Sequence, residues 1–238
     1  MRSPRKTLEK NLFKSGYRLI YAVDEVGMGC LAGPVVVCAV TMTNQFYNKH
    51  HKKLQGVRDS KLLQAKQRGV FSAELLKEKD LVYALAYSYP KTIDKLNIYN
   101  AARLAMKRAV LWLANPKSEI LNPKQSPKIS NPKSETVSNL VLRASDLKSI
   151  VLVDGRGKVP GLPMDQLAIV KGDRKVFAIA CASIIAKVFR DKMMARYAQK
   201  YPGYGFEKHK GYGTKYHQAR LIALGPCAIH RQSFRLKY

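Results

Sequence analysis

The amino-acid sequence predicts an α/β fold: a mixed central sheet flanked by helices, followed by a helical C-terminal region. Short segments rich in branched and aromatic residues come first, which is typical of strands. Segments with apolar residues at helical spacing then alternate with further strand-like segments. The chain ends in an aromatic, glycine-rich and basic stretch around one helical segment. This order of elements favours a sheet domain with a helical appendage.

Five segments are predicted as strands because each is short and rich in apolar residues. Four segments are predicted as helices from their apolar spacing, and Asn97 is a suitable N-cap for the second of them. Residues 46–62 are basic and are expected to form a loop. The expected strands are 18–25, 34–42, 81–88, 150–154 and 167–170, and the expected helices are 64–79, 97–114, 176–200 and 214–224.

Residues 115–149 interrupt this pattern. The sequence Asn-Pro-Lys-Ser-Glu occurs at 115–119 and again at 131–135, with a partial copy at 122–124. Proline is incompatible with a helix interior or a central strand, and this composition buries little surface. We therefore expect a flexible surface insertion whose end, 141–144, forms at most a turn of helix.

The composition is that of a globular protein. The chain has 238 residues, 46% of them hydrophobic, which suffices for a buried core. Neither a membrane span nor a secretory signal is expected, because no apolar run is long enough for either. A transit segment stays open, since Glu9 is the only acid in the first 20 residues. Four scattered cysteines indicate reduced thiols in a cytoplasmic protein, without a zinc or disulfide framework.

The charge of the chain favours a polyanionic partner. There are 43 lysines and arginines against 16 acids, a net charge of +27. A field of that sign attracts nucleic acids and speeds their arrival. A ribosome-associated protein, or a proteome that is basic throughout, would show the same excess. Charge alone therefore indicates a class of partner and no chemistry.

Four acids stand out in this basic chain. Asp24 and Glu25 lie at the end of one apolar strand, Asp154 at the end of another, and Asp173 before a long helix. Carboxylates in apolar surroundings need a partner or a metal ion. Several together favour Mg²⁺ or Mn²⁺, and two such ions can activate water for phosphodiester cleavage. Taken singly, each acid has an ordinary alternative as a helix cap or a turn residue.

The sequence around Asp24 poses two questions. Successive strand residues point to opposite faces, so we expect Glu25 to lie where the strand ends, with Gly27 and Gly29 allowing the turn. With Gly33, these glycines are also similar to a dinucleotide-binding fingerprint. That alternative is disfavoured, because strand-like residues follow the glycines instead of a helix, and the two carboxylates before them would repel phosphate.

Several blocks resemble the ribonuclease HII (type 2 ribonuclease H) family, in family order across roughly residues 18–234 apart from the insertion. The blocks are AVDEVGMGCLAGPV at 22–35, DSKL at 59–62, LVDG at 152–155, IVKGDRK at 169–175, ASIIAKVFRD at 182–191, YPGYGF at 201–206, HKGYGT at 209–214 and HRQSF at 230–234. The resemblance implies a ribonuclease H-like fold. It implies a catalytic domain over 1–200, which includes the 115–149 insertion, and a helical, substrate-binding region over 201–238.

The resemblance implies that Asp24, Glu25, Asp154 and Asp173 are the catalytic residues and bind two divalent ions, Mg²⁺ or Mn²⁺. The implied reaction is hydrolysis of the RNA strand of RNA–DNA hybrids, and of duplex DNA on the 5′ side of a single embedded ribonucleotide. The products carry 3′-hydroxyl and 5′-phosphate ends. Such an endonuclease serves ribonucleotide excision during DNA replication and repair.

The resemblance further implies that the glycine motif and Tyr212 read the RNA–DNA junction, where the 2′-hydroxyl distinguishes RNA. Ser183 and Lys187 share a helix face, so both meet the nucleic acid, or Ser183 only packs and Lys187 is solvated. Lys61 contacts phosphate or is solvated, and Tyr212 stacks or belongs to the core. The candidate nucleic-acid contacts are Gly27, Met28, Gly29, Lys61, Ser183, Lys187 and Tyr212. Phosphate contacts or structural hydrogen bonds are expected of His209, His217 and His230.

Two positions depart from the family pattern. Met28 stands where the family usually has arginine, and Cys30 where it usually has proline. Arginine makes forked, charge-assisted bonds to phosphate, which methionine cannot. If the glycine backbone does most of the reading, specificity survives and affinity falls. If the arginine is essential, cleavage at single ribonucleotides weakens.

Three hypotheses follow: a ribonuclease that reads the junction, a related hydrolase that needs several ribonucleotides, and a catalytically silent nucleic-acid-binding protein. The presence of all four carboxylates argues against the third. The expected partners are RNA–DNA hybrids and duplex DNA with embedded ribonucleotides, and the chain is expected to be a monomer without membrane contact. The resemblance leaves room for a sliding clamp as a protein partner.

Overall fold

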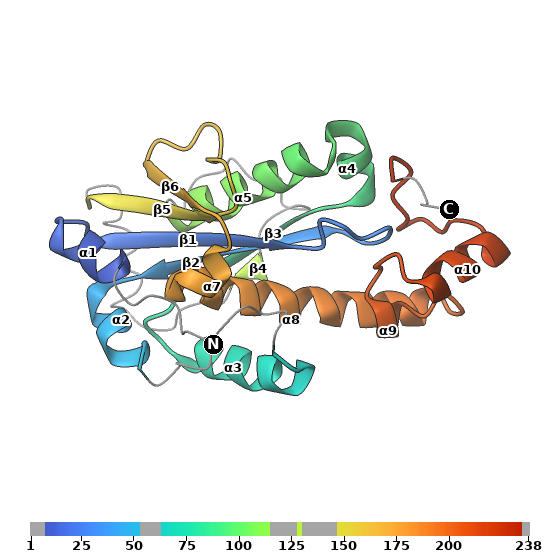
Figure 1. Ribbon diagram of the computed structural model, residues 1–238, viewed down its shortest axis with the longest axis horizontal. Coiled ribbons are helices and arrows are strands. Elements are labelled where there is room, and N and C mark those ends of the chain that lie inside the picture. The colour runs from blue at the N-terminus through green and yellow to red at the C-terminus, as the bar shows by residue number, and fades with distance from the viewer. Residues whose placement is uncertain (1–7, 53–62, 115–127, 130–146, 235–238) are drawn as a thin grey trace.

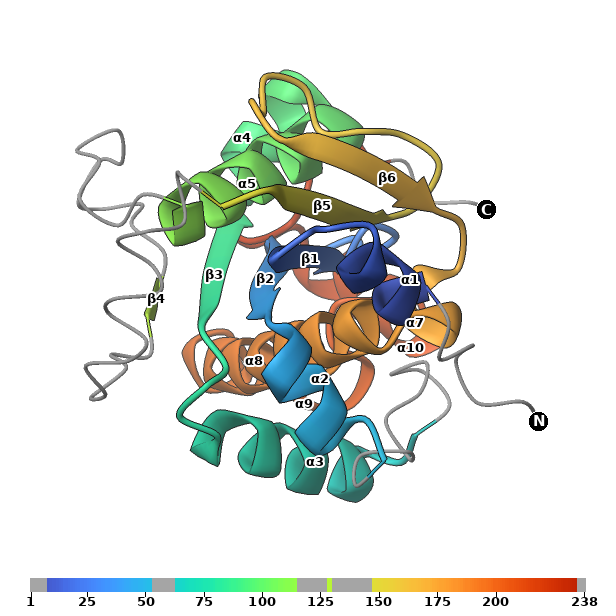
Figure 2. The same ribbon diagram turned by 90° about the vertical axis from the view of Figure 1, so that its left-hand side faces the viewer.

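The computed structural model describes residues 8–52, 63–114, 128–129 and 147–234. A six-stranded sheet lies between two layers of helices (Figure 1, Figure 2). The strand order is β4-β3-β2-β1-β5-β6. Neighbours from β4 to β1 are antiparallel, whereas β5 and β6 run parallel to β1, so the expected mixed sheet is confirmed. The strands are β1 (Leu19–Val26), β2 (Val35–Met42), β3 (Tyr83–Ser88), β4 (Lys128–Ile129), β5 (Ser149–Asp154) and β6 (Asp165–Ile169).

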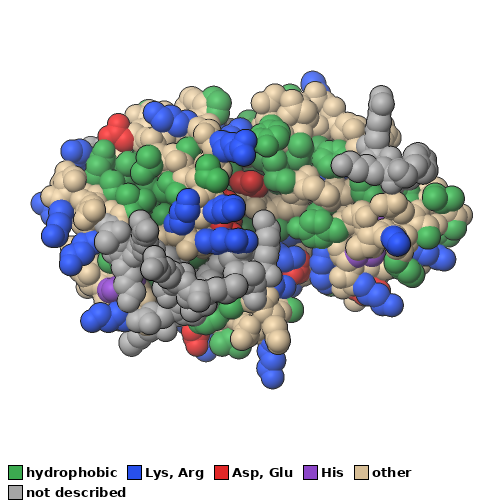
Figure 3. Space-filling model, in the orientation of Figure 1, with side chains coloured by type: hydrophobic (Ala, Val, Ile, Leu, Met, Phe, Trp, Pro, Cys, Tyr) green, Lys and Arg blue, Asp and Glu red, His purple; other side chains and the backbone are tan. Residues whose placement is uncertain are grey.

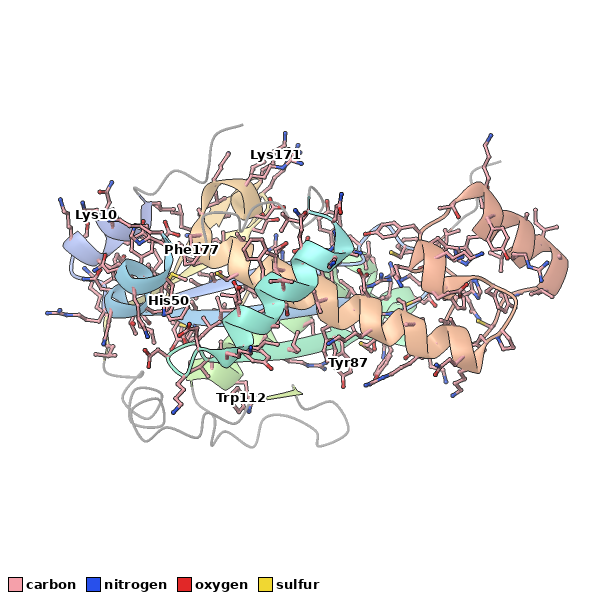
Figure 4. The ribbon with its side chains drawn as sticks, turned by 90° about the horizontal axis from the view of Figure 1, so that it is seen from below. Lys10, His50, Tyr87, Trp112, Lys171 and Phe177 are labelled. Atoms are coloured by element: carbon pink, nitrogen blue, oxygen red, sulfur yellow. The ribbon has the colours of Figure 1, made fainter. Side chains whose placement is uncertain are left out.

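The helices form two layers and a C-terminal extension. They are α1 (Leu8–Lys14), α2 (Asn44–His50), α3 (Ala65–Lys77), α4 (Pro90–Leu96), α5 (Ile98–Ala114), α7 (Gly172–Lys175), α8 (Phe177–Lys200), α9 (Phe206–His209) and α10 (Lys215–Leu224). Helix α5 covers one face of the sheet and α8 the other, with α9 and α10 beyond the end of α8 (Figure 1). Seen from below, α3 lies across α8 (Figure 4). The first residue of α8, Phe177, lies at the same end of the molecule as His50 of α2 (Figure 4). None of the described helices could cross a membrane.

The core consists of two apolar layers, one on each face of the sheet. Ile20 and Ala22 pack toward α8, whereas Leu19, Tyr21 and Val23 pack toward α5. All five side chains are buried. Burial on both faces explains why β1 is apolar from Leu19 to Val23, without the alternation of a half-exposed strand. The same alternation decides to which side each acid at the end of β1 projects.

Most expected elements are confirmed, with ends shifted by one or two residues. Asn97 accepts a hydrogen bond from the backbone N–H of Asn100 at 3.0 Å, as expected of an N-cap. The expectation of a loop over 46–62 was wrong at its start, because α2 runs to His50. Thr43 caps this helix by accepting from the N–H of Phe46 at 3.1 Å, and Phe46 is buried. Of 115–149, the described part includes β4, a strand the sequence did not predict; 141–144 lies outside the described residues.

Candidate active site

A pocket of about 230 Å³ opens where β1 and β5 end. Every predicted site residue that the structure describes lines it, together with Val26. Lys61 lies outside the described residues. Figure 3 shows acidic side chains near the middle of this face, with lysine and arginine side chains close beside them. Residues from β1, β5, α7, α8 and the segment after α9 therefore meet in one place.

The sheet register places the two strand-end aspartates next to each other. Ala22 pairs with Leu152 and Val23 with Val153 across β1 and β5. Asp24 and Asp154 follow these pairs. Since Ala22 and Leu152 both belong to the layer under α8, the alternation of strand residues turns the two aspartates to that same face.

The sequence had suggested that Glu25 lies where the first strand ends. In the structure β1 continues one residue further, to Val26. The regular alternation turns Glu25 toward α5, opposite to Asp24. Both side chains still line the pocket, which lies at the edge where the sheet ends. Asp24 and Glu25 therefore approach it from opposite sides of the sheet.

Asp24 is held in a polar cluster inside the protein. Its side chain is 4% exposed, and its Oδ1 accepts from the N–H of Glu25 at 2.7 Å. Burial raises the pKa of Asp24 well above its usual range, and the charges of Glu25 and Asp154 raise it further. A hydrogen bond with the Ser183 side chain acts in the opposite direction. Ser183 is thus neither a mere packing residue nor solvated, because it faces the carboxylate from α8.

Asp154 is oriented by the turn before α7. Its Oδ1 accepts from the N–H of Gly172 at 2.6 Å. A Cβ atom on Gly172 would lie 3.1 Å from that oxygen and 2.6 Å from Cδ1 of Ile179, so a side chain there would have to displace both. Lys171, with a left-handed φ of 57°, turns the chain into α7. Asp173, 7% exposed, then projects from the first turn.

A buried arginine from α8 supports the glycine segment that follows β1. Arg190 is fully buried and donates to the carbonyl oxygens of Pro34 at 3.0 Å, Ala32 at 3.2 Å and Lys210 at 2.8 Å. Gly27 has a φ of +96°, and a Cβ atom there would lie 2.3 Å from Nε of Arg190. The close approach of this guanidinium therefore requires glycine at position 27.

A second buried arginine reaches the same segment from the C-terminal end. Arg231 donates to the carbonyl oxygens of Gly27 at 2.6 Å, Met28 at 2.9 Å and Gly33 at 3.0 Å. Backbone bonds add to this support, because the N–H of Leu31 donates to the carbonyl oxygen of Gly211 at 2.8 Å. Neither arginine was predicted to support the site; the available signal was an arginine among the apolar residues around position 190.

Tyr212 lies at the rim of the pocket and is 36% exposed, so it is not a core residue. Its carbonyl oxygen accepts from Nδ1 of His217 at 2.9 Å. Since a carbonyl only accepts, Nδ1 of His217 carries the proton and its Nε2 is free to accept. His230 supplies that donor, with 3.1 Å between the two Nε2 atoms. The N–H of Cys227 in turn donates to Nδ1 of His230 at 2.9 Å.

A third histidine holds the other side of the Tyr212 turn. His209 accepts from the N–H of Gly211 at 3.1 Å through Nδ1, and its Nε2 lies 2.8 Å from the carbonyl oxygen of Tyr204. The three histidines are therefore neutral, with every ring nitrogen engaged. Burial lowers the pKa of His217 to about 4 and that of His230 in the same direction. Of the two expected roles, these residues make structural hydrogen bonds.

Met28 and Lys187 complete the lining of the pocket. Met28 packs against an apolar cluster that includes Val35 and Ala102. Lys187 donates to Oδ1 of Asp191, one turn along α8, at 2.7 Å, and its Nζ lies 5.9 Å from the centre of the Tyr212 ring. The lysine is thus held beside the tyrosine. The departure at position 28 replaces a cation with an apolar contact to α5.

The donor set suits a hard divalent cation, because four carboxylates supply the oxygen ligands that such ions prefer. Burial is the main cause of the raised pKa of Asp24, and the charges of Glu25, Asp154 and Asp173 raise it further. Among the described residues, no three such side chains already surround one ion position.

Comparisons with known proteins agree with this geometry. The family model for ribonuclease HII matches residues 22–237. Ribonuclease HII of Caldicellulosiruptor saccharolyticus is 44% identical over 95% of this chain and 92% of its own. That of Hyphomonas neptunium is 40% identical over 92% of this chain and 95% of its own.

Solved structures share the fold. Ribonuclease H2 of Pyrococcus horikoshii OT3 superposes with a TM-score of 0.60 at 22% identity, covering 91% of this chain and 93% of that one. The structure of the PCNA:RNase HII complex from Archaeoglobus fulgidus superposes with a TM-score of 0.61 at 23% identity, covering 92% of this chain and 96% of that one. Bst-RNase HIII in complex with Mn²⁺ superposes with a TM-score of 0.57 at 16% identity, covering 92% of this chain and 68% of that one. Given the matches to the family model and to its curated members, the chain belongs to the ribonuclease HII family and is a ribonuclease H endonuclease.

Proposed function

We propose that this ribonuclease H cuts duplex DNA on the 5′ side of an embedded ribonucleotide, as well as the RNA strand of hybrids, by two-metal-ion hydrolysis. One observation carries the proposal: the four carboxylates and the residues proposed to read the junction line the same pocket. A scissile phosphate at the carboxylates would then lie within one nucleotide of the glycine segment and Tyr212. The alternative of a silent binding protein is set aside, because the family is one of enzymes.

Asp24, Glu25, Asp154 and Asp173 are proposed to hold two Mg²⁺ or Mn²⁺ ions. When bound, such ions activate a water and stabilise the leaving oxygen. The crowding at Asp24 supports this, since two divalent cations would offset the repulsion among the carboxylates. The related Bst-RNase HIII forms a complex with Mn²⁺.

The other pocket residues are proposed to select and place the substrate. The backbone of Gly27 and Gly29 comes close to the 2′-hydroxyl, which a side chain at either position would hinder. The half-exposed Tyr212 ring stacks on the neighbouring sugar. Ser183 holds Asp24 in place, and Lys187 contacts a phosphate beside Tyr212. Lys61 is proposed as a further phosphate contact.

The test is cleavage of a DNA duplex with one ribonucleotide, in Mg²⁺ or Mn²⁺, beside Asp154→Asn as the control. We expect a single cut directly 5′ of the ribonucleotide, leaving a 3′-hydroxyl and a 5′-phosphate, and no cut by the control. Cutting by the wild type on the 3′ side, or equal cutting by the control, would refute the proposal.

The second candidate function is cleavage restricted to hybrids with several ribonucleotides. The packing of Met28 against α5 favours it, because no guanidinium from position 28 enters the pocket. In that case the wild type would cut a long hybrid and leave the single ribonucleotide intact, and Met28→Arg would restore the single-ribonucleotide cut. A wild type that cuts both substrates makes this candidate unnecessary.

Partners and location stay predictions. One related structure joins the Archaeoglobus fulgidus enzyme to PCNA, and on that basis a sliding clamp is proposed as a partner class here. A monomer in solution and a cytoplasmic location are expected from the sequence. Light scattering coupled to size exclusion measures the first, and a pull-down with the host clamp measures the clamp contact.

A further inference from the structure

A groove of about 770 Å³ continues from the catalytic pocket on the other side of the carboxylates. The two hollows share Glu25, Met28 and Asp154. Beyond these residues the groove is lined by α5 and by the loop that follows β5. A polymer that crosses the carboxylates therefore has a continuous path out of the pocket along α5.

The groove presents the side chains that a nucleic-acid strand needs. Tyr99, on the first turn of α5, is 68% exposed, which is a large exposure for an aromatic ring. Arg103 lies one turn further along the same face of α5, and Arg156 faces it from the loop after β5. Met106 and Val170 give the groove apolar walls. Surfaces that bind single-stranded nucleic acids commonly combine aromatic rings, on which bases stack, with cations that contact phosphates.

The two arginines are available to a ligand. Within the described part of the chain, neither Arg103 nor Arg156 forms an ion pair with a carboxylate. Among the described residues, the hydrogen-bond partner of the Nη1 atom of Arg103 is the weak acceptor Sδ of Met106, at 3.7 Å. A Cβ atom on Gly157 would lie 3.3 Å from Nη2 of Arg103, so the glycine leaves room for the guanidinium over the loop. Both cations can therefore exchange water for phosphate.

The groove has a direction relative to the cut, and this step rests on the function proposed above. The ribonucleotide is proposed to lie at Gly27, Gly29 and Tyr212, which line the pocket but not the groove. A cut on its 5′ side places the scissile phosphate at the carboxylates. The upstream neighbour must then lie beyond Glu25 and Asp154, where the groove begins. The opposite orientations of Asp24 and Glu25 fit a strand that passes the sheet edge from the α8 side to the α5 side.

We propose that this groove is the binding site for the nucleotides upstream of the cut, on the strand that is cleaved. Arg103 and Arg156 contact their phosphates, and the Tyr99 ring stacks on a sugar or base. The occupant is the segment that keeps the new 3′-hydroxyl after hydrolysis. The groove thus holds one product, while the glycine segment and Tyr212 hold the other.

The experiment compares three duplexes that carry one ribonucleotide opposite a full-length complement. The first has upstream and downstream arms of about ten nucleotides, the second has a single upstream nucleotide, and the third has a single downstream nucleotide. The proteins are the wild type, Tyr99→Ala, Arg103→Ala and, as the matched control, Arg196→Ala. Arg196 is exposed on α8 and lines neither hollow. The readout is kcat/KM, with KM and kcat resolved.

We expect Tyr99→Ala and Arg103→Ala each to lower kcat/KM by about tenfold on the first and third duplexes, mainly through KM. On the second duplex they should lose much less, because only the first upstream nucleotide can then reach the groove. Arg196→Ala should match the wild type on all three. An equal loss on the first and second duplexes, or a loss that vanishes when the downstream arm is removed, would overturn the assignment.

The failure of this proposal differs from that of the proposed function. If the wild type cuts 5′ of the ribonucleotide but the groove variants behave like Arg196→Ala, only the groove assignment falls. If the wild type leaves the single ribonucleotide uncut, the proposed function is refuted. The assignment of the groove to the upstream side of the cut is then refuted as well. Melting curves of Tyr99→Ala should match the wild type, because the ring it removes is mostly exposed.

Discussion

Nη2 of Arg231 donates to the carbonyl oxygen of Gly27 at 2.6 Å, across a separation of 204 residues in the chain. The same guanidinium serves two further carbonyls of that segment. A lysine carries the charge but lacks the planar fork, so Arg231→Lys should leave at least two buried carbonyls without a donor. We expect a loss of about 3 kcal/mol in the free energy of unfolding, measured by urea titration.

The control for this variant is Arg196→Lys, which changes an exposed side chain of α8 and should leave the urea midpoint unchanged. Arg231→Lys should also lose activity on a single embedded ribonucleotide at temperatures where it remains folded. Unchanged stability of Arg231→Lys would mean that the three carbonyls do not need this donor.

Alanine substitutions at Gly27 and Gly29 distinguish a loss of stability caused by backbone strain from a loss of activity caused by hindered substrate contact. Gly27→Ala should destabilise the protein by about 2 kcal/mol or more, because its φ is +96° and its Cβ atom would collide with Arg190. Gly29→Ala should melt like the wild type, because φ at Gly29 is ordinary and none of the described atoms lies within 4 Å of a Cβ atom there. Gly29→Ala should nevertheless cut a single ribonucleotide more slowly, if substrate approaches that backbone closely. Full activity of Gly29→Ala would remove Gly29 from the proposed reading surface.

Asp24→Asn should stabilise the metal-free protein while abolishing cleavage. Burial and the neighbouring carboxylates raise the pKa of Asp24, so its charged form costs stability at neutral pH. Asparagine keeps the acceptor for the N–H of Glu25 and removes the charge. We expect a melting temperature about 4 °C higher in EDTA. Mn²⁺ should raise the melting temperature of the wild type and have less effect on the variant; a variant less stable than the wild type in EDTA would contradict this account.

The histidine network predicts a loss of stability in mild acid. Burial lowers the pKa of His217 from 6.5 to about 4, so the folded protein keeps this ring neutral where the unfolded chain protonates it. The unfolded state therefore binds more protons between these two values, and stability falls as the pH drops from about 6.5 toward 4. The loss from this residue is on the order of 2 kcal/mol. Urea midpoints at pH 7.5 and 5 measure it.

His217→Asn is the matched variant for the acid effect, because its Nδ2 can replace the donor to the carbonyl oxygen of Tyr212 and does not titrate. Its stability should depend less steeply on pH than that of the wild type. The same slope in both proteins would assign the acid sensitivity to other groups, with His230, whose pKa burial also lowers, as the nearest.

The positions of the aspartates could be predicted from sequence because local rules determine them. Asp24 and Asp154 each follow an uninterrupted apolar run, and the carboxyl ends of parallel strands meet at one edge of a sheet. The end of β1 was predicted one residue too early, at Glu25, because the exact end of the strand depends on its pairing with β2, which reaches Val26.

The supports of the site could not be predicted, because their partners are backbone carbonyls distant in the chain. The apolar residues around Arg190 are a weak local signal of its burial, and the sequence around Arg231 offers none, since arginine is normally exposed. Helix α2 was missed for a related reason: it is short, and the burial of Phe46 and Tyr47 against the rest of the protein stabilises it more than its own periodicity does.

The bonds between Arg231 and the segment that follows β1 also bear on the order in which the site can form during synthesis. The acids of β1, β5 and α7 have all been synthesised before residue 231 emerges, and domains begin to fold from the N-terminal side during translation. The carbonyls of Gly27, Met28 and Gly33 then face water until the last segment arrives. If the proposed reading of the ribonucleotide depends on this segment, a nascent chain would acquire it late, and a protease that trims the C-terminal region past Arg231 would remove it.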